Sequence, residues 1–390
     1  MSENDYLIEV SPGLADVKAE EWDALLAAQA RPTPFMRHAW LSALIDSGSA
    51  VPETGWQPLA LALRTPDRQL VGASLAWLKS HSYGEYVFDW AWADAYRRHG
   101  LDYYPKLLVA VPFTPVPGSR LLARGPTERR HLVQGLQALA QRAGASSIHL
   151  LFGDDADFEA TASAGWMARQ GVQFHWQADP AAPCADFEAL LARMQHDKRK
   201  KIRQERRKVA EAGVRFEARE GLQIRPDDWA YFYRCYALTY QQHRSSPYLS
   251  PAFFAAMQGG LAGHWLLFTA WQGEDRIGCA LVAIDREHGT AWGRYWGATA
   301  PVPCLHFEAC YYQPLQWCLT QGFTRFEGGA QGEHKMARGL LPCGTGSAHW
   351  VADTRFAQAI GEHLAQEGAQ MADYMGELEE RSPFHRGALP

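Results

Sequence analysis

The feature of this 390-residue chain that most restricts its fold is a repeated order of elements. Residues 56–80 hold two apolar runs around a polar turn at 65–68, and residues 265–285 hold two more around a turn at 272–275. Two strand-like runs separated by polar turn residues are typical of a β-hairpin. Each half of the chain is therefore expected to contain a hairpin.

Each predicted hairpin is followed by a helix, a glycine and a short strand. These elements lie at residues 131–142, 144 and 147–152 in the first half and at 305–319, 322 and 323–326 in the second. A glycine directly after the last periodic residue is the expected stop of a helix. Hairpins combined with a helix and a strand must bury their apolar sides in layers. The predicted fold class is α/β, with two copies of one unit, each a mixed sheet flanked by helices.

Chain length and one proline-rich stretch predict where the two copies divide. A chain of this length exceeds the usual size of a single core, so two domains are expected. Residues 178–183 contain two prolines, and a new helix is expected from Asp186. The predicted domains are residues 1–180 and residues 181–390.

Composition narrows the class of protein. A net charge of −5 argues against a general coat for nucleic acid, so any polyanion contact needs a local basic patch. The N-terminus lacks the basic start and apolar run of a signal peptide, and no apolar run approaches the roughly 18 residues that span a bilayer. The seven cysteines include no Cys-x-x-Cys pair, which indicates reduced thiols. These features predict a soluble, cytoplasmic protein.

Residues 83–113 in the first half have no counterpart in the second. Alternating aromatic residues there would share one face of a strand; they are Tyr86, Phe88, Trp90 and Trp92. The following residues 103–106 and 112–115 contain too many prolines for central strands. One interpretation is packing between domains. The other is a wall of an acceptor pocket, lined by Trp92 and Tyr104, with Lys106 facing an anionic group.

A strongly basic segment opens the second half. Residues 198–208 hold eight cations and one acid, within good helix formers that run from 187 to 212 and stop at Gly213. In a helix, four arginines share one face; they are Arg199, Arg203, Arg206 and Arg207. One interpretation is a solvated helix face. The other is a partner for a phosphate or pyrophosphate, a tRNA backbone or an acidic surface, because arginine suits phosphate through its bidentate fork.

Two motifs of the second half place charged groups beside aromatic rings. In a strand over residues 292–297, Arg294 would lie between the indoles of Trp292 and Trp296, oriented toward a carboxylate or phosphate. His306 and Glu308 follow at the positive end of a helix, where an anion or a proton-transfer group is favoured. Pro314 is expected to kink this helix or to reset its start.

The loop at residues 326–339 holds the densest cluster of reactive side chains. Four glycines permit positive φ and close ligand approach. Acid, imidazole and amine groups are the usual means of proton transfer and anion binding; here they are Glu333, His334, Lys335 and Arg338. A polar surface loop is the alternative interpretation. The corresponding loop after Phe152 lacks such a cluster, so one active site is expected, in the second domain.

Two other kinds of site are not expected. The histidines and acids at 306, 308, 333 and 334 lack the helix spacing of metal ligands, so no metal is predicted. The chain also has no Gly-x-Ser-x-Gly motif, which argues against a serine hydrolase of that type.

Together these motifs resemble the FemAB-like branch of the GNAT acyltransferase superfamily. The matching segments occur in the same order over nearly the whole chain and comprise residues 106, 112–115, 118–120, 199–203, 293–297, 305–308 and 327–339. The resemblance implies tandem GNAT-like domains. It also implies a peptidoglycan-related aminoacyl transfer from aminoacyl-tRNA to an amine on a peptide. Residues 335–340 echo the Phe-Lys-x-Gly-Phe-like motif of Fem-type enzymes, with Lys335 in the place of the lysine.

An acetyl-CoA-dependent transferase is expected to show a Gln/Arg-x-x-Gly-x-Gly/Ala turn before its main helix, where backbone N–H groups hold the pyrophosphate. Residues 300–304 and 123–127 stand at the two corresponding places, and neither fits. Their prolines remove the required donors. Acetyl-CoA is therefore the alternative donor and aminoacyl-tRNA the favoured one, with no tightly bound cofactor.

The sequence thus predicts an acyl or aminoacyl transferase that acts on an amine-bearing small molecule or peptide. Glu308 or Glu333 would take the amine proton, with His306 or His334 as the alternative base. Lys335 and Arg338 would steady the oxyanion or the leaving group. Arg294 and Trp296 would hold the acceptor, and the arginines at 199, 203, 206 and 207 would hold the donor phosphates. The alternatives are an acetyl-CoA-dependent N-acetyltransferase and a non-catalytic module that binds peptidoglycan fragments or acidic ligands.

Overall fold

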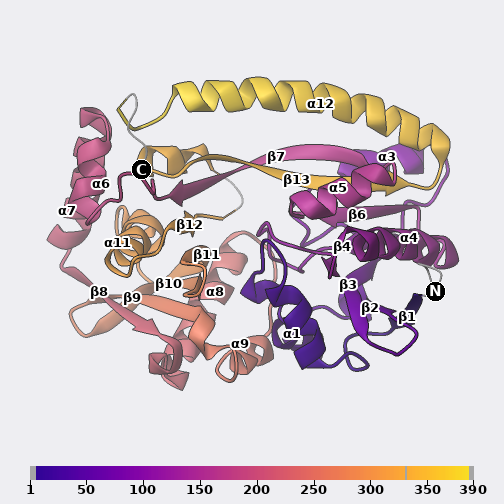
Figure 1. Ribbon diagram of the computed structural model, residues 1–390. Coiled ribbons are helices and arrows are strands. Elements are labelled where there is room, and N and C mark those ends of the chain that lie inside the picture. The colour runs from indigo at the N-terminus through magenta and orange to yellow at the C-terminus, as the bar shows by residue number, and fades with distance from the viewer. Residues whose placement is uncertain (1–5, 330–331, 386–390) are drawn as a thin grey trace. The chain divides into compact units, whose positions relative to one another are not determined.

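The computed structural model describes residues 6–329 and 332–385 (Figure 1). Two compact units divide the chain. Unit 1 comprises Met1–Gly171, Tyr248–Phe253 and Gly344–Asp373, and unit 2 comprises Val172–Pro247, Phe254–Cys343 and Tyr374–Pro390. The chain passes between the units within β7 (Met167–Gln177), α9 (Pro251–Ala256), β13 (Leu341–Val351) and α12 (Thr354–Glu380), and in the loop before α9.

Unit 1 contains a mixed sheet with the strand order β1-β2-β3-β4-β6-β13, and β5 pairs with β3. Its strands are β1 (Leu7–Ser11), β2 (Trp56–Arg64), β3 (Leu70–Lys79), β4 (Lys106–Val109), β5 (Leu122–Ala123) and β6 (Ser147–Leu151). The neighbours pair antiparallel except β4 and β6, which pair parallel.

The helices of unit 1 are α1 (Ala19–Ala27), α2 (His38–Asp46), α3 (Trp90–Arg98), α4 (Pro126–Arg142) and α5 (Asp155–Ser163). Leu132 and Leu136 of α4 are fully buried in one core cluster with Leu61 of β2 and Leu107 of β4. This apolar stripe at i and i+4 fixes α4 against the sheet.

The strands of unit 2 are also mixed in direction, in the order β7-β12-β11-β10-β9-β8. Its further strands are β8 (Val214–Glu220), β9 (Trp265–Gln272), β10 (Asp275–Asp285), β11 (Thr290–Ala298) and β12 (Arg325–Glu327). Here β11 and β12 pair parallel and the other neighbours antiparallel. The strands of the two units therefore share one pattern, in which a hairpin leads to a third strand and a helix returns the chain to a parallel neighbour.

The helices of unit 2 include α6 (Phe187–Arg193), α7 (His196–Glu211), α8 (Pro226–Gln242), α10 (Leu305–Phe307) and α11 (Gln313–Thr320). Between α10 and α11 the chain forms a π-helical turn at Glu308–Tyr312, and a short 3-10 helix spans Glu333–Arg338. The core cluster joins Leu190 and Ile202 of α6 and α7 to Phe268 of β9, Leu315 of α11 and Phe326 of β12.

The predicted fold class is confirmed, because each unit is a mixed sheet flanked by helices. The two hairpins form as β2–β3 and β9–β10, and α4 and β6 follow the first as expected. In the second half, Pro314 stands at the first turn of α11, directly after the π-helical turn at Glu308–Tyr312, so the start of α11 is reset near it as expected. The π-helical turn absorbs the change of register before this proline.

The strand expected from the alternating aromatics at 86–92 is wrong. Residues 80–89 form a loop, and α3 begins at Trp90, with Trp92 and Tyr96 buried at i and i+4. The alanines between the aromatic residues favour a helix, and tertiary burial decides the period. Lys106 also begins β4, which lies between β3 and β6, so the expectation of no central strand there is wrong. Pro105 stands just before that strand, where it removes no ladder hydrogen bond.

The single helix expected over 187–212 is two helices. Gln195 is in an extended conformation between α6 and α7, and Met194 forms a bridge with Phe384. The predicted inward stripe is nevertheless confirmed, because Ile202 and Val209 are buried together with Met194. A tertiary contact thus interrupts a segment whose local propensity is helical throughout.

All seven cysteines are free thiols. No helix within residues 6–329 and 332–385 combines the length and the apolar character that a membrane span requires.

Candidate functional site

The loop that follows β12 carries the predicted lysine in unit 2. Gly332 and Gly339 flank its 3-10 helix with φ of 113° and 89°, values that L side chains rarely adopt. Lys335 points inward, is 3% exposed and donates from Nζ to the Gly329 carbonyl oxygen at 2.8 Å. Of the predicted loop, Ala330 and Gln331 lie outside the described residues.

Lys335 is buried, with no acid beside it among the described residues. Within the described residues no carboxylate lies within ion-pair distance of its amine. Burial lowers the pKa of Lys335 to about 8, and the Cys310 thiol acts weakly in the opposite direction. An amine with such a pKa exchanges a proton near neutral pH far more readily than an exposed lysine does.

Arg338 is also buried, but it is held by an acid of helix α7. Its Nη2 donates to Glu205 Oε1 at 2.9 Å, its Nη1 donates to the His334 carbonyl oxygen at 2.6 Å, and its guanidinium lies 3.5 Å from the centre of the Phe307 ring. Tyr312 donates its hydroxyl to the same Glu205. Sequence reasoning missed Glu205, although it is the one acid within the basic run at 198–208.

Glu308 and Arg206 were predicted for different roles, and they form an ion pair with each other. Arg206 donates from Nη2 to Glu308 Oε1 at 3.0 Å and from Nε to both carboxylate oxygens at 3.2 Å. Gln313 donates to Glu308 at 2.7 Å, and Arg206 also donates to Gln316 at 2.9 Å. Residues 205 and 206 are neighbours on α7. Residue 205 binds the 3-10 helix of the loop, and residue 206 binds the π-helical turn.

Glu333 lies apart from these contacts. It is exposed and accepts from the Tyr374 hydroxyl at 2.5 Å and from Arg381 Nη1 at 3.2 Å. The predicted acid of the loop therefore contacts the end of α12 rather than Lys335.

The two predicted histidines lie on one aromatic wall. The His306 ring centre is 5.1 Å from that of Trp296 and 5.6 Å from that of Tyr311, whose hydroxyl lies 3.2 Å from His334 Nε2. Burial lowers the pKa of His306 to about 4, and the nearby cations act in the same direction. Burial and the same cations lower the pKa of His334. Both imidazoles are therefore neutral at pH 7.

A cavity of about 380 Å³ opens beside this wall. Its lining includes Thr239 and Gln242 of α8, Trp296 of β11, and His306 and Phe307 of α10. Its volume suits a small ligand or the end of a larger one. The structure thus brings together the predicted residues at 296, 306, 334, 335 and 338.

Arg294 lies in a bulge of β11. The pairing with β10 shifts between Leu281 and Val282, so the strict alternation that would align Trp292, Arg294 and Trp296 is interrupted. The guanidinium lies 5.1 Å from the ring centre of Tyr295 and donates to its hydroxyl at 3.1 Å.

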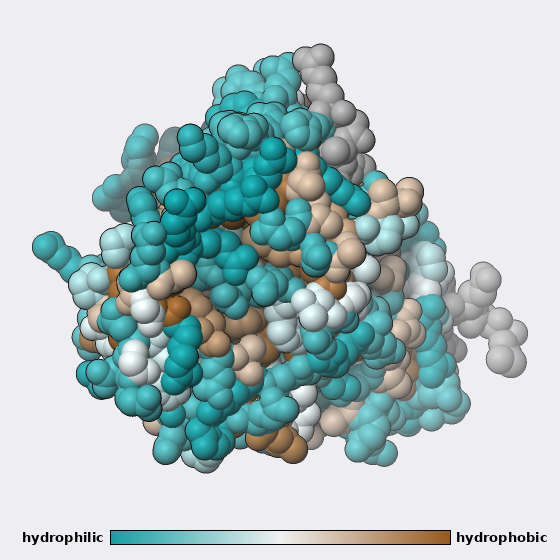
Figure 2. Space-filling model, turned by 90° about the vertical axis from the view of Figure 1, so that its left-hand side faces the viewer, coloured by the Kyte–Doolittle hydropathy of each residue, from teal (hydrophilic) through white to brown (hydrophobic). Residues whose placement is uncertain are grey.

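The remaining basic residues of α7 form a polar surface (Figure 2). Arg207 is exposed, and Arg203 forms an ion pair with Glu188 at 2.6 Å while half exposed. Arg199 donates at 3.5 Å to the Ala192 carbonyl oxygen. Among the contacts of the described residues, Arg206 is the one of the four predicted arginines that pairs with another predicted site residue, Glu308.

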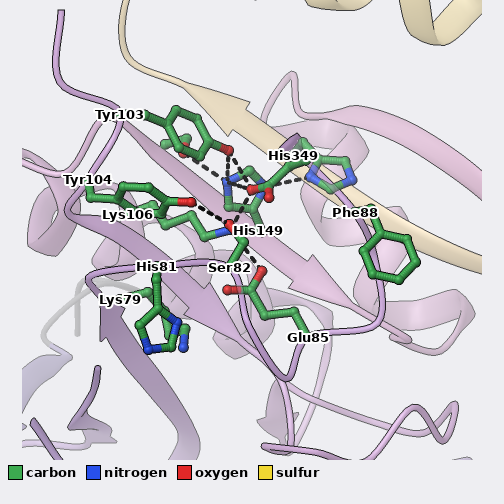
Figure 3. A network of polar contacts seen from close by, with 12 residues as sticks. Lys79, His81, Ser82, Glu85, Phe88, Tyr103, Tyr104, Lys106, His149 and His349 are labelled. Atoms are coloured by element: carbon green, nitrogen blue, oxygen red, sulfur yellow. Dashed lines mark hydrogen bonds and ion pairs between the residues drawn. The ribbon is translucent and has the colours of Figure 1, made fainter. Parts of the chain in front are cut away.

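Unit 1 contains a second polar cluster, centred on the predicted residue Lys106 (Figure 3). Lys106 is fully buried and donates to Ser82 Oγ at 2.8 Å, to Glu85 Oε2 at 2.7 Å and to Asp89. Burial works against its charge, but the two carboxylates outweigh burial and raise the pKa of Lys106. The anionic group that Lys106 was predicted to face is supplied by the protein itself.

The cluster extends from Asp89 to a pair of histidines. Tyr103 donates to Asp89 at 2.6 Å, and its hydroxyl lies 3.1 Å from His149 Nε2. His149 and His349 stand opposite each other on β6 and β13, with 2.7 Å between their Nδ1 atoms. Burial lowers the pKa of both imidazoles, that of His349 to about 3.

The other predicted residues of unit 1 belong to the wall of this cluster. Tyr104 places its hydroxyl 2.8 Å from Ser82 Oγ, and Trp92 is buried with its ring centre 5.0 Å from that of His349. No described residues group three or more His, Cys, Asp or Glu side chains in a way that could hold a metal ion.

Comparisons with known proteins find a family and a fold. The model of the FemAB-like family, described as peptidoglycan biosynthesis/recognition, matches residues 13–386. No curated protein matches the chain. Among solved structures, L-PGS from Bacillus licheniformis is 11% identical, with a TM-score of 0.52 over 86% of this chain and 93% of that chain. A conserved protein of unknown function from Bacteroides thetaiotaomicron is 8% identical, with a TM-score of 0.52 over 88% of this chain and 99% of that chain.

A tandem GNAT protein from the clavulanic acid biosynthesis pathway is also similar. It is 14% identical, with a TM-score of 0.46 over 89% of this chain and 99% of that chain. At such identities these likenesses concern the fold alone.

Proposed function

This chain belongs to the FemAB-like family, and we propose that it is a transferase that moves an acyl group onto the nitrogen of an amine acceptor. The observation that carries the proposal is Lys335, a buried amine with no acid partner among the described residues and a pKa of about 8. It belongs to the same cluster of rings and cations as His306, which lines the cavity of unit 2. Perturbed groups of this kind gather at sites of chemistry more often than at structural positions.

The proposed reaction uses these side chains as follows. The acceptor nitrogen attacks the acyl carbon, an N–C bond forms, and the bond from that carbon to the donor oxygen or sulfur breaks. The amine proton passes to a neutral imidazole, His306 or His334, and then to the leaving group. Lys335 in its charged form stabilises the oxyanion. Glu308 and Glu333 are weaker candidates for the base than the histidines, because each carboxylate is paired with an arginine.

The acceptor class is proposed from the family and from the cavity. The family description concerns peptidoglycan, so the proposed acceptor is an amine on a cell-wall peptide or a related small molecule. Trp296 lines the cavity and is the proposed contact for the acceptor, with Arg294 on the same strand. Arg338 serves the site indirectly, because Glu205 holds its guanidinium.

Aminoacyl-tRNA is the proposed donor. The support is the exposed basic side of α7, which offers Arg203, Arg207 and their lysine neighbours to a phosphate backbone. Acetyl-CoA is the second candidate, supported by the cavity at the start of α10. Pro301 and Pro303 in the preceding loop lack the N–H groups that would hold a pyrophosphate. Both donors place the reaction in the cytoplasm.

The test is an acyl-transfer assay with the whole protein, charged tRNA or acetyl-CoA, and a panel of peptide and small-molecule amines. Lys335→Met should lower turnover by about a hundredfold or more, as the loss of an oxyanion donor does. Lys18→Met, an exposed lysine of unit 1, is the matched control. Undiminished turnover in Lys335→Met would refute the assignment. Saturable binding of the acceptor by the wild type without turnover on any donor would favour the non-catalytic module.

The donor is distinguished by two binding measurements. Arg207→Gln should weaken tRNA binding and reduce the slope of affinity against salt by about one, as expected for one lost phosphate contact. Acetyl-CoA should leave the melting temperature unchanged; a rise that saturates with its concentration would make CoA the donor.

A further inference from the structure

Unit 1 buries two carboxylates that the proposed reaction does not use. Glu85 and Asp89 are 4% and 3% exposed, and each binds the Lys106 amine through one oxygen. Their other oxygens, Glu85 Oε1 and Asp89 Oδ1, have no hydrogen-bond partner among the described residues. Lys106 already donates to three oxygens and has no further hydrogen to offer. Buried acceptors without donors are rare and costly, so these oxygens require an explanation.

A second buried lysine has hydrogen-bond donors with too few acceptors. Lys79 stands directly across from Lys106 in the register of β3 and β4 and is fully buried. Among the described residues its amine donates to one acceptor, the Tyr83 carbonyl oxygen at 3.4 Å, and it lies 3.4 Å from the centre of the Trp56 ring. Within the described residues no ion pair joins it to Glu85, although the two charges act on each other. Lys79 thus retains hydrogens that no acceptor of the described part of the chain uses.

The free acceptors and the free donor belong to one cluster whose charges balance. Two lysines face two acids, so a ligand with a net charge would leave the buried cluster unbalanced, and a neutral ligand would not. Burial moves the pKa of Lys79 down and that of Glu85 up, both to about 7, in agreement with the long hydrogen bond of Lys79 and the unpartnered oxygen of Glu85. A ligand that adds one cation beside the acids and one anion beside Lys79 satisfies both.

We propose that unit 1 binds the zwitterionic group of an α-amino acid, with its ammonium on Glu85 and Asp89 and its carboxylate on Lys79. The ammonium would donate to Glu85 Oε1 and Asp89 Oδ1, and the carboxylate would accept from Lys79 Nζ. This inference does not depend on the proposed acyl transfer, because no residue around Lys335 takes part in it.

The loop at residues 80–89 forms the cover of this site. Ser82, Glu85 and Asp89 face inward to Lys106, as Figure 3 shows for the first two. On the outside, Tyr83 and Phe88 are 58% and 52% exposed. The acids that would hold the ligand are therefore carried by a loop, whereas the lysines are carried by strands.

The test is calorimetric titration of the whole protein with a panel of free L- and D-amino acids, repeated with the N-acetyl and methyl ester forms of any that bind. At least one amino acid should bind saturably and raise the melting temperature. Blocking either end should weaken binding about tenfold or more, the loss expected for one charge-assisted hydrogen bond. Because this arm uses only the wild type, it does not depend on the folding of a variant.

Variants then locate the ligand. Glu85→Gln and Lys79→Met should each weaken binding about tenfold or more, whereas the exposed controls Glu53→Gln and Lys18→Met should bind as the wild type does. Absence of saturable binding by every amino acid overturns the inference. So does equal binding of the N-acetyl form, or wild-type affinity in folded Glu85→Gln and Lys79→Met.

Discussion

Each unit buries a lysine that the sequence singled out, and the two lysines differ in what surrounds them. Lys106 in unit 1 is held by Glu85 and Asp89, whereas Lys335 in unit 2 donates to a backbone carbonyl. Burial disfavours the charge on both amines. The acids outweigh burial at Lys106 and raise its pKa, but nothing does so at Lys335, whose pKa falls to about 8.

The comparison teaches that the presence of a buried acid separates two uses of a lysine. Where acids lie beside it, the lysine amine stays charged and binds a loop to a strand through ion pairs. Without them, it is costly for the fold and available for chemistry, which is the common trade between stability and activity at functional sites. The opposite responses of stability to removal of each lysine test this distinction.

Removal of Lys106 is expected to have the largest effect. Lys106→Met leaves Glu85 and Asp89 buried without their cation, and loss of one partner of a buried ion pair costs about 3–5 kcal/mol. Urea unfolding measures the change, with Lys18→Met as the exposed control, expected to lie within about 0.5 kcal/mol of the wild type. A loss below about 1 kcal/mol would mean that the cluster does not hold unit 1 together.

Glu205 comes next, because it links α7 to the loop of Lys335. Glu205→Gln leaves the Arg338 guanidinium without its acid and should cost about 3 kcal/mol, the upper range for a hydrogen bond to a charged group. The double variant Glu205→Gln/Arg338→Gln should recover part of this loss, with a coupling energy of about 0.5–3 kcal/mol. Strictly additive losses would contradict the link.

Replacement of Lys335 should increase the free energy of unfolding, whereas replacement of Lys106 should decrease it. The folded pKa of Lys335, about 8, lies below its ordinary 10.5, so the charged amine destabilises the fold wherever it is protonated. Lys335→Met should therefore be more stable than the wild type at pH 7, by roughly 2–3 kcal/mol. Between pH 8 and 10.5 the unfolded chain binds the proton that the folded chain has released, so wild-type stability rises and the advantage of the variant shrinks.

The measurement is chemical unfolding of both proteins at several pH values. A gap between the two proteins that stays constant from pH 7 to pH 10.5 would show that Lys335 titrates normally. A variant less stable than the wild type at pH 7 would show that Lys335 has a stabilising partner.

The smallest effect is expected at Glu333. This acid pairs with Arg381 while half exposed, and exposed ion pairs contribute about 0–1 kcal/mol. Glu333→Gln should therefore leave the free energy of unfolding and the transfer rate nearly unchanged, as measured by urea unfolding and by the acyl-transfer assay. A large loss of turnover at unchanged stability would return Glu333 to the role of base.

Much of the fold follows from local pattern. The two hairpins, helix α4 and the glycine stops were predicted because apolar period and turn residues are read from neighbours in the chain. The same method failed at residues 83–113, where the alternating aromatics belong to a loop and the start of helix α3. It also failed at residues 194–195, where a bridge between Met194 and Phe384 interrupts a helix. In both places the deciding contact comes from a distant part of the sequence.

The candidate site likewise has features that follow from local sequence and features that depend on distant contacts. The sequence by itself determined which segments carry reactive groups, including Lys335, His306 and Lys106, because residue type and glycine content are local. It did not reveal Glu205, Glu85 or Lys79, which act only as partners of those groups. Tertiary structure alone decided which cations have an acid beside them and which do not. That choice sets the pKa of each amine, because burial and pairing are properties of the folded environment.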